Sequence, residues 1–301
     1  MNFYQKLVSI IEERRIYRDE PMRLHTTFRV GGPADFFVCP NTIEEVRGLI
    51  QICEEENMPY YILGNGSNLL VGDKGYRGVV IQIYKEMNGI QVEGERIKVQ
   101  AGALLSRIGN IALESELTGF EFAAGIPGTI GGAVVMNAGA YGGEMKDVLE
   151  TVTVLCPNGE IKVLENEELE LGYRTSIIAK KGFIVLEAVV KLSRGDKEAI
   201  RERMNELKIQ RTTKQPLEYP SAGSTFKRPT GYFAGKLIQD AGLRGFQVGG
   251  AQVSEKHCGF VINKENATAA DIVELMNQVA AIVKEKFGVE LEPEVKRLGE
   301  F

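Results

Sequence analysis

The stretch GIPGTIGGAVVMNAGAYGGE, residues 125–144, carries seven glycines and decides the fold class. Each glycine raises the conformational cost of folding, by up to about 1 kcal/mol in a regular element. Such a density inside a domain indicates a backbone pressed against a large flat ligand, with tight backbone packing alone as the alternative. The pair Gly131-Gly132, followed by alanine, would also let the N-terminus of a helix approach a phosphate.

A second glycine loop, GNGSN at residues 64–68, follows the short apolar run YYIL. It matches the dinucleotide fingerprint poorly, because Leu69 stands at the third glycine position and no helix is expected to open there. Its backbone N–H groups could still form an anion nest around phosphate oxygens, and a tight loop without ligand is the alternative. We expect the two glycine loops together to clamp one dinucleotide.

Composition narrows the class of protein. With 301 residues, 44% of them hydrophobic, the chain can form two or three domains with a real core. The net charge of -5 argues against non-specific nucleic-acid binding, and no apolar run approaches the roughly 20 residues of a membrane span. Four scattered cysteines and two histidines predict no metal site. We expect a cytoplasmic enzyme with reduced thiols, and the sequence identifies no protein partner.

Hydrophobic periodicity predicts the regular elements. Helices are predicted over residues 3–14, 42–58, 103–115, 196–211 and from Thr268 to just before Gly288. Thr42 with Glu45, and Thr268 with Asp271, are each expected to form a capping box. Strands are predicted over residues 26–40 with a turn at 31–33, 60–63, 78–83, 183–192, and in hairpins over 90–100, turning at Glu93-Gly94, and 152–164, turning at Asn158-Gly159.

Six motifs occur in one order across nearly the whole chain. They are TTFRVGGPADFFV (26–38), ILGNGSNLLVGD (62–73), the glycine stretch 125–144, LGYRTS (171–176), SAGSTFKRP (221–229) and LEPEVKRLG (291–299). Together they closely resemble the UDP-N-acetylenolpyruvoylglucosamine reductase family, flavoenzymes that make UDP-N-acetylmuramate for the bacterial cell wall.

The resemblance implies an α+β architecture: a two-subdomain FAD-binding fold of the vanillyl-alcohol-oxidase-like superfamily, then a smaller α+β substrate-binding domain. The implied boundaries are 1–85 and 86–195 for the two FAD-binding subdomains and 196–301 for the substrate-binding domain. The chain is similar to the shorter type within the family, because only a few residues separate GYRTS from the next strand. A substrate-capping tyrosine loop is therefore not expected.

The implied reaction uses NADPH to reduce noncovalently bound FAD, which then reduces the enolpyruvyl double bond of UDP-N-acetylglucosamine enolpyruvate. Hydride addition leaves negative charge on the neighbouring carbon and its carboxylate, and that carbon needs a proton. The resemblance assigns proton donation to Ser224 and a catalytic carboxylate to Glu294, while Arg174 is suited to gripping the substrate carboxylate. If the motif alignment slipped by two residues, Glu292 would compete with Glu294. The three catalytic residues are expected to converge where hydride leaves the flavin.

The binding residues follow from the same motifs. The cofactor-binding candidates are Gly64, Asn65, Gly66, Ser67, Asn68, Gly125, Gly128, Thr129, Gly131, Gly132, Asn137 and Gly139. Tyr173, Arg211 and Lys227 are candidates for the substrate, since cations near SAGSTFKRP suit its diphosphate. Neither His25 nor His257 lies in a motif for covalent flavin attachment.

Three alternatives remain open at this point. A flavin oxidase of the same fold would act on a small hydroxy acid or sugar and produce peroxide. A flavin-free protein that binds nucleotide sugars would leave Ser224 without a chemical role. A serine hydrolase would pair Ser224 with His257, but the sequence around Ser224 lacks the second glycine of the G-x-S-x-G elbow.

Overall fold

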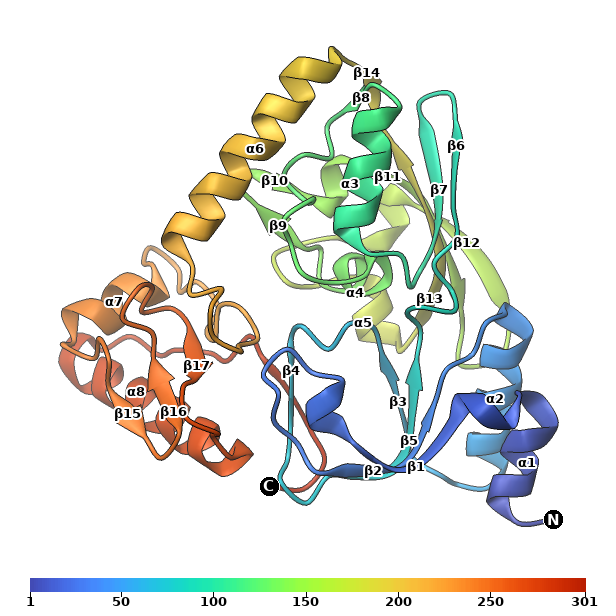
Figure 1. The fold of residues 1–301 in the computed structure, drawn as a ribbon, viewed down its shortest axis with the longest axis horizontal. Coiled ribbons are helices and arrows are strands. Elements are labelled where there is room, and N and C mark those ends of the chain that lie inside the picture. The colour runs from blue at the N-terminus through green and yellow to red at the C-terminus, as the bar shows by residue number, and fades with distance from the viewer. The chain divides into compact units, whose positions relative to one another are not determined.

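The computed structural model describes residues 1–301, which fold as two compact units (Figure 1). Unit 1 consists of Met1–Tyr17, Phe36–Asn65 and Gly78–Arg211, and unit 2 of Arg18–Asp35, Gly66–Arg77 and Thr212–Phe301. Each unit therefore gathers three separate parts of the chain. The predicted three-domain division at residues 85 and 195 stays a prediction.

Helices are interspersed with runs of strands along the whole chain. The helices are α1 Phe3–Ile10, α2 Ile43–Glu55, α3 Leu105–Glu114, α4 Ile130–Val135, α5 Ile177–Lys181, α6 Lys197–Lys214, α7 Ala234–Asp240 and α8 Ala269–Phe287. The strands are β1 Ile16–Pro21, β2 Pro33–Val38, β3 Tyr60–Leu63, β4 Leu69–Val71, β5 Tyr76–Gln82, β6 Ile90–Glu93, β7 Arg96–Gln100, β8 Leu117–Thr118, β9 Gly139–Ala140, β10 Gly143–Glu144, β11 Leu149–Leu155, β12 Ile161–Glu165, β13 Ile184–Lys191, β14 Ser193–Arg194, β15 Gln247–Val248, β16 Ala251–Val253, β17 Val261–Asn263 and β18 Lys296–Leu298. The mixed α+β class is confirmed.

A five-stranded antiparallel sheet forms the larger part of unit 1, in the order β12-β11-β13-β7-β6. The two predicted hairpins build its edges. Gly159 has φ +79° in the loop between β11 and β12, as the Asn-Gly signal predicts. In the other hairpin Glu93 pairs with Arg96, so the turn residues are Gly94 and Glu95, one position later than predicted.

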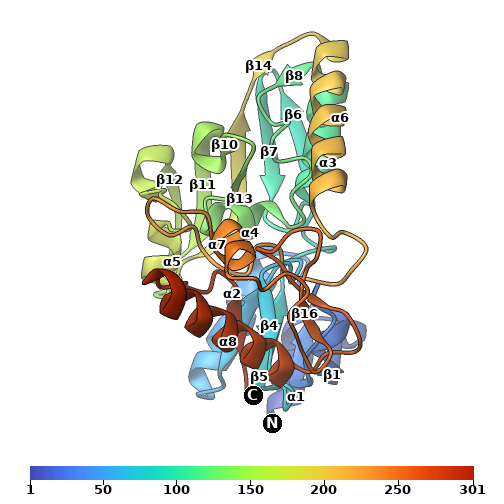
Figure 2. The same cartoon turned by 90° about the vertical axis from the view of Figure 1, so that its left-hand side faces the viewer.

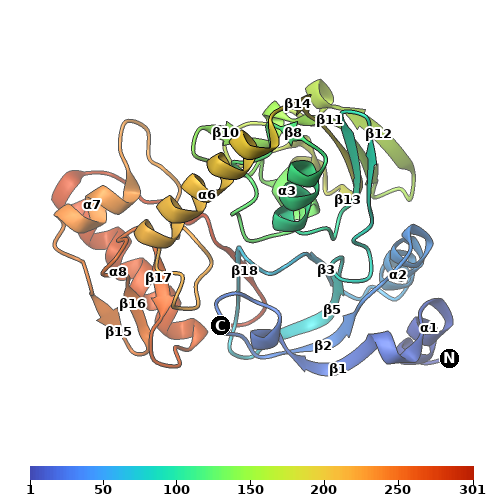
Figure 3. The same cartoon turned by 45° about the horizontal axis from the view of Figure 1, so that its top comes forward.

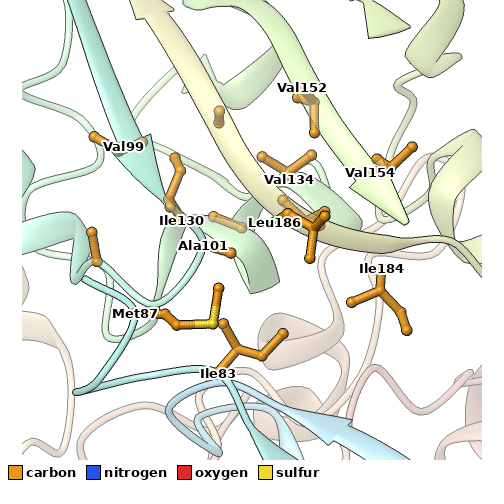
Figure 4. Close-up of a cluster of buried hydrophobic side chains, with 14 of the residues drawn as sticks. Ile83, Met87, Val99, Ala101, Ile130, Val134, Val152, Val154, Ile184 and Leu186 are labelled. Atoms are coloured by element: carbon orange, nitrogen blue, oxygen red, sulfur yellow. The ribbon is translucent and has the colours of Figure 1, made fainter. Parts of the chain in front are cut away.

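The core of unit 1 lies between this sheet and helix α4, which packs against β13 and β7. In Figure 4, Val152 and Val154 of β11 and Leu186 of β13 lie near Val134 and Ile130 of the helix, and all five are buried. Buried and more exposed residues alternate along β7 and over residues 186–190 of β13, which is the period-2 pattern of a sheet with one buried face.

The N-terminal part of unit 1 contains the predicted helix after Thr42. Thr42 caps α2 by accepting a hydrogen bond from the N–H of Glu45 at 3.1 Å, as predicted. The second half of the expected capping box is wrong. The Glu45 carboxylate instead accepts two hydrogen bonds of 2.6 Å from the buried guanidinium of Arg15 and one of 2.7 Å from the N–H of Asn41. The Glu45 carboxylate pairs with Arg15 because the buried guanidinium would otherwise be desolvated without a counter-ion.

Unit 2 contains a three-stranded antiparallel sheet, β15-β16-β17, against which the long helix α8 packs (Figures 2 and 3). The ends of α8 follow the sequence prediction. Thr268 and Asp271 form a capping box, and Gly288 ends the helix at φ +68°. In the same unit β18 pairs with β4 in parallel, so the last strand joins the segment that follows the first glycine loop.

The strand prediction over residues 26–40 is half wrong. Only its second part forms a strand, β2, while the chain before it has a 3₁₀ turn at Met22–Leu24 and no strand up to Gly32. The N–H groups of Met22 and Arg23 donate to the carbonyls of Gly32 and Gly31, so the segment folds back on itself. These backbone hydrogen bonds within the segment take the place of the hydrogen bonds to a neighbouring strand that its β-branched and aromatic residues favour.

No helix of the structure combines the length and the apolar character needed to cross a lipid bilayer.

Candidate active site

The glycine stretch 125–144 contains the short helix α4. The N–H groups of Ile130 and Gly131 donate to the carbonyls of Ala103 and Ala101, at 2.8 and 2.9 Å. Those of Gly132 and Ala133 are taken by the side chain and carbonyl of the N-cap, Thr129. The first-turn N–H groups of Ile130, Gly131 and Gly132 therefore each have a partner within the protein. The expectation that this helix N-terminus receives a phosphate stays a prediction.

Close packing explains part of the glycine density. A Cβ on Gly131 would lie 3.0 Å from both the Cβ and the carbonyl oxygen of Ala101, so glycine lets α4 approach the end of β7. Gly139 pairs with Glu144 in the β9–β10 ladder, where a Cβ would meet the Gly143 carbonyl at 2.7 Å. These two predicted cofactor residues have a structural reason to be glycine.

Other glycines of the stretch leave an open backbone face. Gly125 and Gly132 are exposed, and their Cβ positions meet no atom closer than 3.4 Å and 3.7 Å. Gly128 is half-buried at φ +154°. A Cβ on Gly64 of the first glycine loop would lie 2.5 Å from the Thr129 hydroxyl, so part of each glycine loop is adjacent within unit 1. A bare backbone face beside a second glycine loop fits a flat ring system such as FAD.

Asn137 lies behind this face rather than on it. It is fully buried with φ +42°, its amide nitrogen donates to the Gly172 carbonyl at 3.2 Å, and its amide oxygen accepts the Lys146 N–H at 2.9 Å. Because backbone groups occupy both ends of the amide, we propose that Asn137 orders the loop instead of contacting the cofactor through its side chain.

Arg174 stands at a strained position. Gly172 and Thr175 exchange two backbone hydrogen bonds, so Tyr173 and Arg174 form a two-residue turn. Arg174 has φ +55°, which costs a non-glycine residue roughly 1–2 kcal/mol. Its guanidinium lies 5.2 Å from the ring centre of Tyr173, which is 54% exposed. Strain held at a charged residue is a reason to propose a function there.

Arg211, near the end of α6, is half-buried. Burial lowers the pKa of its guanidinium, and the phenol of Tyr141 is the one titratable group that acts against this shift. No carboxylate pairs with it. Its Cδ lies 3.4 Å from the Cβ position of Gly125, so the arginine stem runs along the open glycine face. A half-buried arginine without a carboxylate partner is suited to an anionic ligand.

The second half of the first glycine loop belongs to unit 2 and is anchored there. Gly66 has φ +65°, and a Cβ would overlap the carbonyl oxygen of His25. Its own carbonyl accepts the Thr27 N–H at 3.1 Å. The Asn68 amide donates to the Glu294 carbonyl at 3.2 Å, while Asn65 and Ser67 are half-buried. The Asn68 side chain, predicted to bind cofactor, thus contacts the segment of a predicted catalytic residue.

Gly66→Ala is expected to destabilise the protein, because alanine pays about 1–2 kcal/mol for the left-handed backbone and also overlaps His25. Urea unfolding measures the loss. The matched control is Gly288→Ala in the same unit, at φ +68° with no atom within 4 Å of the Cβ position. A loss for Gly66→Ala no larger than that of the control would contradict the packing argument.

Ser224 and Glu294 lie on neighbouring segments of unit 2. Phe226 and Pro293 form an antiparallel bridge, and the N–H of Glu294 donates to the carbonyl of Thr225 at 2.9 Å. Ser224 is exposed and its neighbour Thr225 is buried, whereas Glu294 is half-buried. Two predicted catalytic residues separated by 70 positions in sequence therefore lie on segments that are joined by backbone hydrogen bonds.

The competing residue Glu292 has a different environment. Its side chain is 70% exposed and forms an ion pair with Lys227, and the backbone N–H of Lys227 donates to the Glu292 carbonyl at 2.8 Å. Glu294 is more protected and is fixed at both its N–H and its carbonyl. This contrast favours Glu294 as the functional carboxylate. Lys227, a predicted substrate residue, has a carboxylate partner on the surface.

His257 does not activate Ser224. Its Nδ1 accepts the N–H of Gly259 at 3.1 Å, its ring packs on Phe260 with centroids 5.0 Å apart, and burial lowers its pKa. No hydrogen bond joins it to the Ser224 hydroxyl. A nucleophile–base pair needs that contact, so the hydrolase alternative lacks its central feature.

Sequence reasoning missed Thr225 and the role of Asn68, because the partners of both are distant in sequence. The signal for Thr225 was a β-branched hydroxyl residue between Ser224 and an aromatic residue. That pattern alone does not separate a buried hydroxyl from an exposed one.

The comparisons with known proteins cover nearly the whole chain. The FAD binding domain model matches residues 34–165, and the UDP-N-acetylenolpyruvoylglucosamine reductase C-terminal domain model matches residues 215–298. The reductase of that name from Caldanaerobacter subterraneus subsp. tengcongensis is 56% identical over 98% of this chain and 97% of its own length. The one from Geobacillus thermodenitrificans is 57% identical over 99% and 98%. The crystal structure of the Thermus caldophilus reductase, 39% identical, superimposes with a TM-score of 0.82 over 94% of this chain and 99% of that chain.

The FAD binding domain model and the reductase relatives define a flavin-dependent oxidoreductase. Within that class, the chain belongs to the UDP-N-acetylenolpyruvoylglucosamine reductase family.

Proposed function

We propose that this protein uses NADPH to reduce UDP-N-acetylglucosamine enolpyruvate to UDP-N-acetylmuramate, a step in the synthesis of peptidoglycan precursors. Noncovalently bound FAD supplies the chemistry of accepting a hydride from NADPH and passing it to the enolpyruvyl carbon. The substrates are small molecules, and four free cysteines together with NADPH as donor support a cytoplasmic reaction.

Each catalytic residue has a distinct part in the proposal. Arg174 binds the carboxylate of the enolpyruvyl group and stabilises the charge that develops on it, since its planar fork matches a carboxylate. Ser224 Oγ donates the proton to the carbon next to the site of hydride addition. Glu294 relays protons around that enolic species and, when its carboxyl is protonated, stabilises it by donating a hydrogen bond, which its half-buried position suits.

The observation that carries the proposal is the hydrogen bond from the Glu294 N–H to the Thr225 carbonyl. It holds the residue after Ser224 in antiparallel register with Glu294. Catalysis by two separate groups requires such fixed geometry, because a misplacement of about 1 Å can cost about 10²-fold in rate.

The test is NADPH consumption by purified, FAD-loaded protein under anaerobic conditions. We expect consumption beyond the single equivalent that reduces the bound FAD only when the enolpyruvyl sugar is present. Oxygen-dependent peroxide formation from a hydroxy acid or sugar, without response to the enolpyruvyl sugar, would support the oxidase alternative instead.

Arg211→Gln is expected to weaken binding of UDP-N-acetylglucosamine enolpyruvate about 10–100-fold, the equivalent of a lost charge-assisted hydrogen bond of about 1.5–3 kcal/mol. The same variant should raise the melting temperature of the unliganded chain, because a desolvated charge without a counter-ion is removed. Titration calorimetry and thermal unfolding measure the two effects.

The matched control is Arg203→Gln on the same helix, where the arginine is exposed and paired with Glu206. Loss of bound FAD with unchanged affinity for the sugar nucleotide would overturn the assignment and place Arg211 with the cofactor residues.

A further inference from the structure

Thr225 is at the centre of the segment that carries Ser224. It is 1% exposed, and each of its three polar groups has a partner. Its hydroxyl accepts the N–H of Val261 at 2.8 Å, its own N–H donates to the Gly259 carbonyl at 2.9 Å, and its carbonyl accepts the N–H of Glu294 at 2.9 Å. The residue therefore joins two different segments of unit 2.

One of these segments belongs to the three-stranded sheet of unit 2. Val261 begins β17, which pairs with β16 and packs against α8. Gly259 is held by His257, whose Nδ1 accepts the Gly259 N–H at 3.1 Å. A further bridge between Ser221 and Ile262 aligns the start of the Ser221–Phe226 stretch with the same strand. The Ser224 segment thus rests on the sheet through Thr225 and Ser221.

The other segment carries the catalytic carboxylate. Glu294 is bound at its N–H by the Thr225 carbonyl and at its carbonyl by the Asn68 amide, which donates at 3.2 Å. Beyond it, Lys296 donates its N–H to the Asn68 carbonyl at 3.1 Å and begins β18. Thr225 therefore links the Glu294 backbone to strand β17 by hydrogen bonds.

We propose that Thr225 is a positioning residue whose buried hydroxyl fixes Ser224 and Glu294 in one geometry relative to strand β17. The hydrogen bond from the Val261 N–H to the Thr225 hydroxyl fixes the position of the Ser224 segment relative to β17. The hydrogen bond from the Glu294 N–H to the Thr225 carbonyl fixes Glu294 relative to the same segment. Thr225 touches no reactant, and its effect runs through Ser224 and Glu294. The inference rests on the proposed function.

The experiment compares Thr225→Val with wild type in stopped-flow measurements of the two half-reactions. Valine keeps the shape but cannot accept a hydrogen bond, so the Val261 N–H is left unpaired and the segment shifts. We expect reoxidation of the reduced flavin by the enolpyruvyl sugar to slow by about 10–100-fold, with reduction by NADPH changed by less than about twofold. The solvent deuterium isotope effect on reoxidation should rise, because proton transfer from Ser224 becomes harder.

Two variants separate positioning from stability. Thr225→Ser keeps the acceptor and should restore reoxidation to within about threefold of wild type. Thr268→Val removes another hydroxyl that accepts a backbone N–H in unit 2, at the N-cap of α8, and should leave both half-reactions unchanged. If the valine variant does not fold, Thr225→Cys, a weak acceptor of similar size, should show an intermediate reoxidation rate.

Reoxidation of Thr225→Val, or of the cysteine variant in its place, at the wild-type rate would overturn the proposal. So would an equal slowing of both half-reactions, or an equal effect of Thr268→Val. Failure of the proposed function gives a different result: wild-type reduced flavin would not react with the enolpyruvyl sugar at all.

Discussion

Ser224→Ala is expected to slow reoxidation of the reduced flavin by the enolpyruvyl sugar about 10²–10⁴-fold, while reduction by NADPH changes by less than about twofold. In the proposed mechanism the exposed hydroxyl of Ser224 supplies a proton only in the second half-reaction, and hydride transfer from NADPH needs none from it. Stopped-flow absorbance of the flavin measures the two rates separately.

The control is Ser221→Ala, three residues earlier in the same segment, where the backbone rather than the hydroxyl bridges to Ile262. This variant should keep both rates. If Ser224→Ala slowed both half-reactions equally, or neither, Ser224 would not be the proton donor.

Arg174→Gly is expected to lower turnover by at least about 10²–10³-fold, the usual cost of removing a group that stabilises transition-state charge. It should also raise the free energy of unfolding by about 1 kcal/mol, because glycine adopts φ +55° without strain. Arg174→Lys keeps the charge without the fork and should recover only part of the activity. Steady-state kinetics and urea unfolding measure the opposing effects.

Glu170→Gly is the matched control for this trade-off. Glu170 has φ +46° in the same unit and is a surface residue paired with Lys180, so glycine there should stabilise the protein without loss of turnover. If Arg174→Gly kept the wild-type turnover, a role of Arg174 in catalysis would be contradicted. If its free energy of unfolding did not rise, the strain argument would be contradicted.

The parts of the fold that the sequence predicted well depend on local interactions. The capping box at Thr268 and the left-handed glycine at 288 are decided within one turn of helix, and the Asn158-Gly159 hairpin within five residues. The Glu45 half of the other capping box failed because its carboxylate meets Arg15, thirty positions away in sequence. Local pattern does not report such a competitor.

The same limit applies to the site. The glycine motifs predicted an FAD-binding domain correctly, but not which glycines are open and which serve packing. Gly131 faces Ala101, while Gly132 is exposed one residue later. Likewise the polar side chains of Asn68 and Asn137 are directed to distant backbone groups. These partners exist only in the folded chain, so residue type alone suggested ligand contacts for both.

The visible spectrum of the purified protein, recorded anaerobically, tests the central claim most directly. We predict a yellow protein that bleaches on addition of NADPH and regains its colour on addition of UDP-N-acetylglucosamine enolpyruvate. That sequence of changes would identify cofactor, donor and acceptor together. A protein that stays colourless after incubation with FAD, or a bleached protein that regains colour with oxygen but not with the enolpyruvyl sugar, would contradict the account.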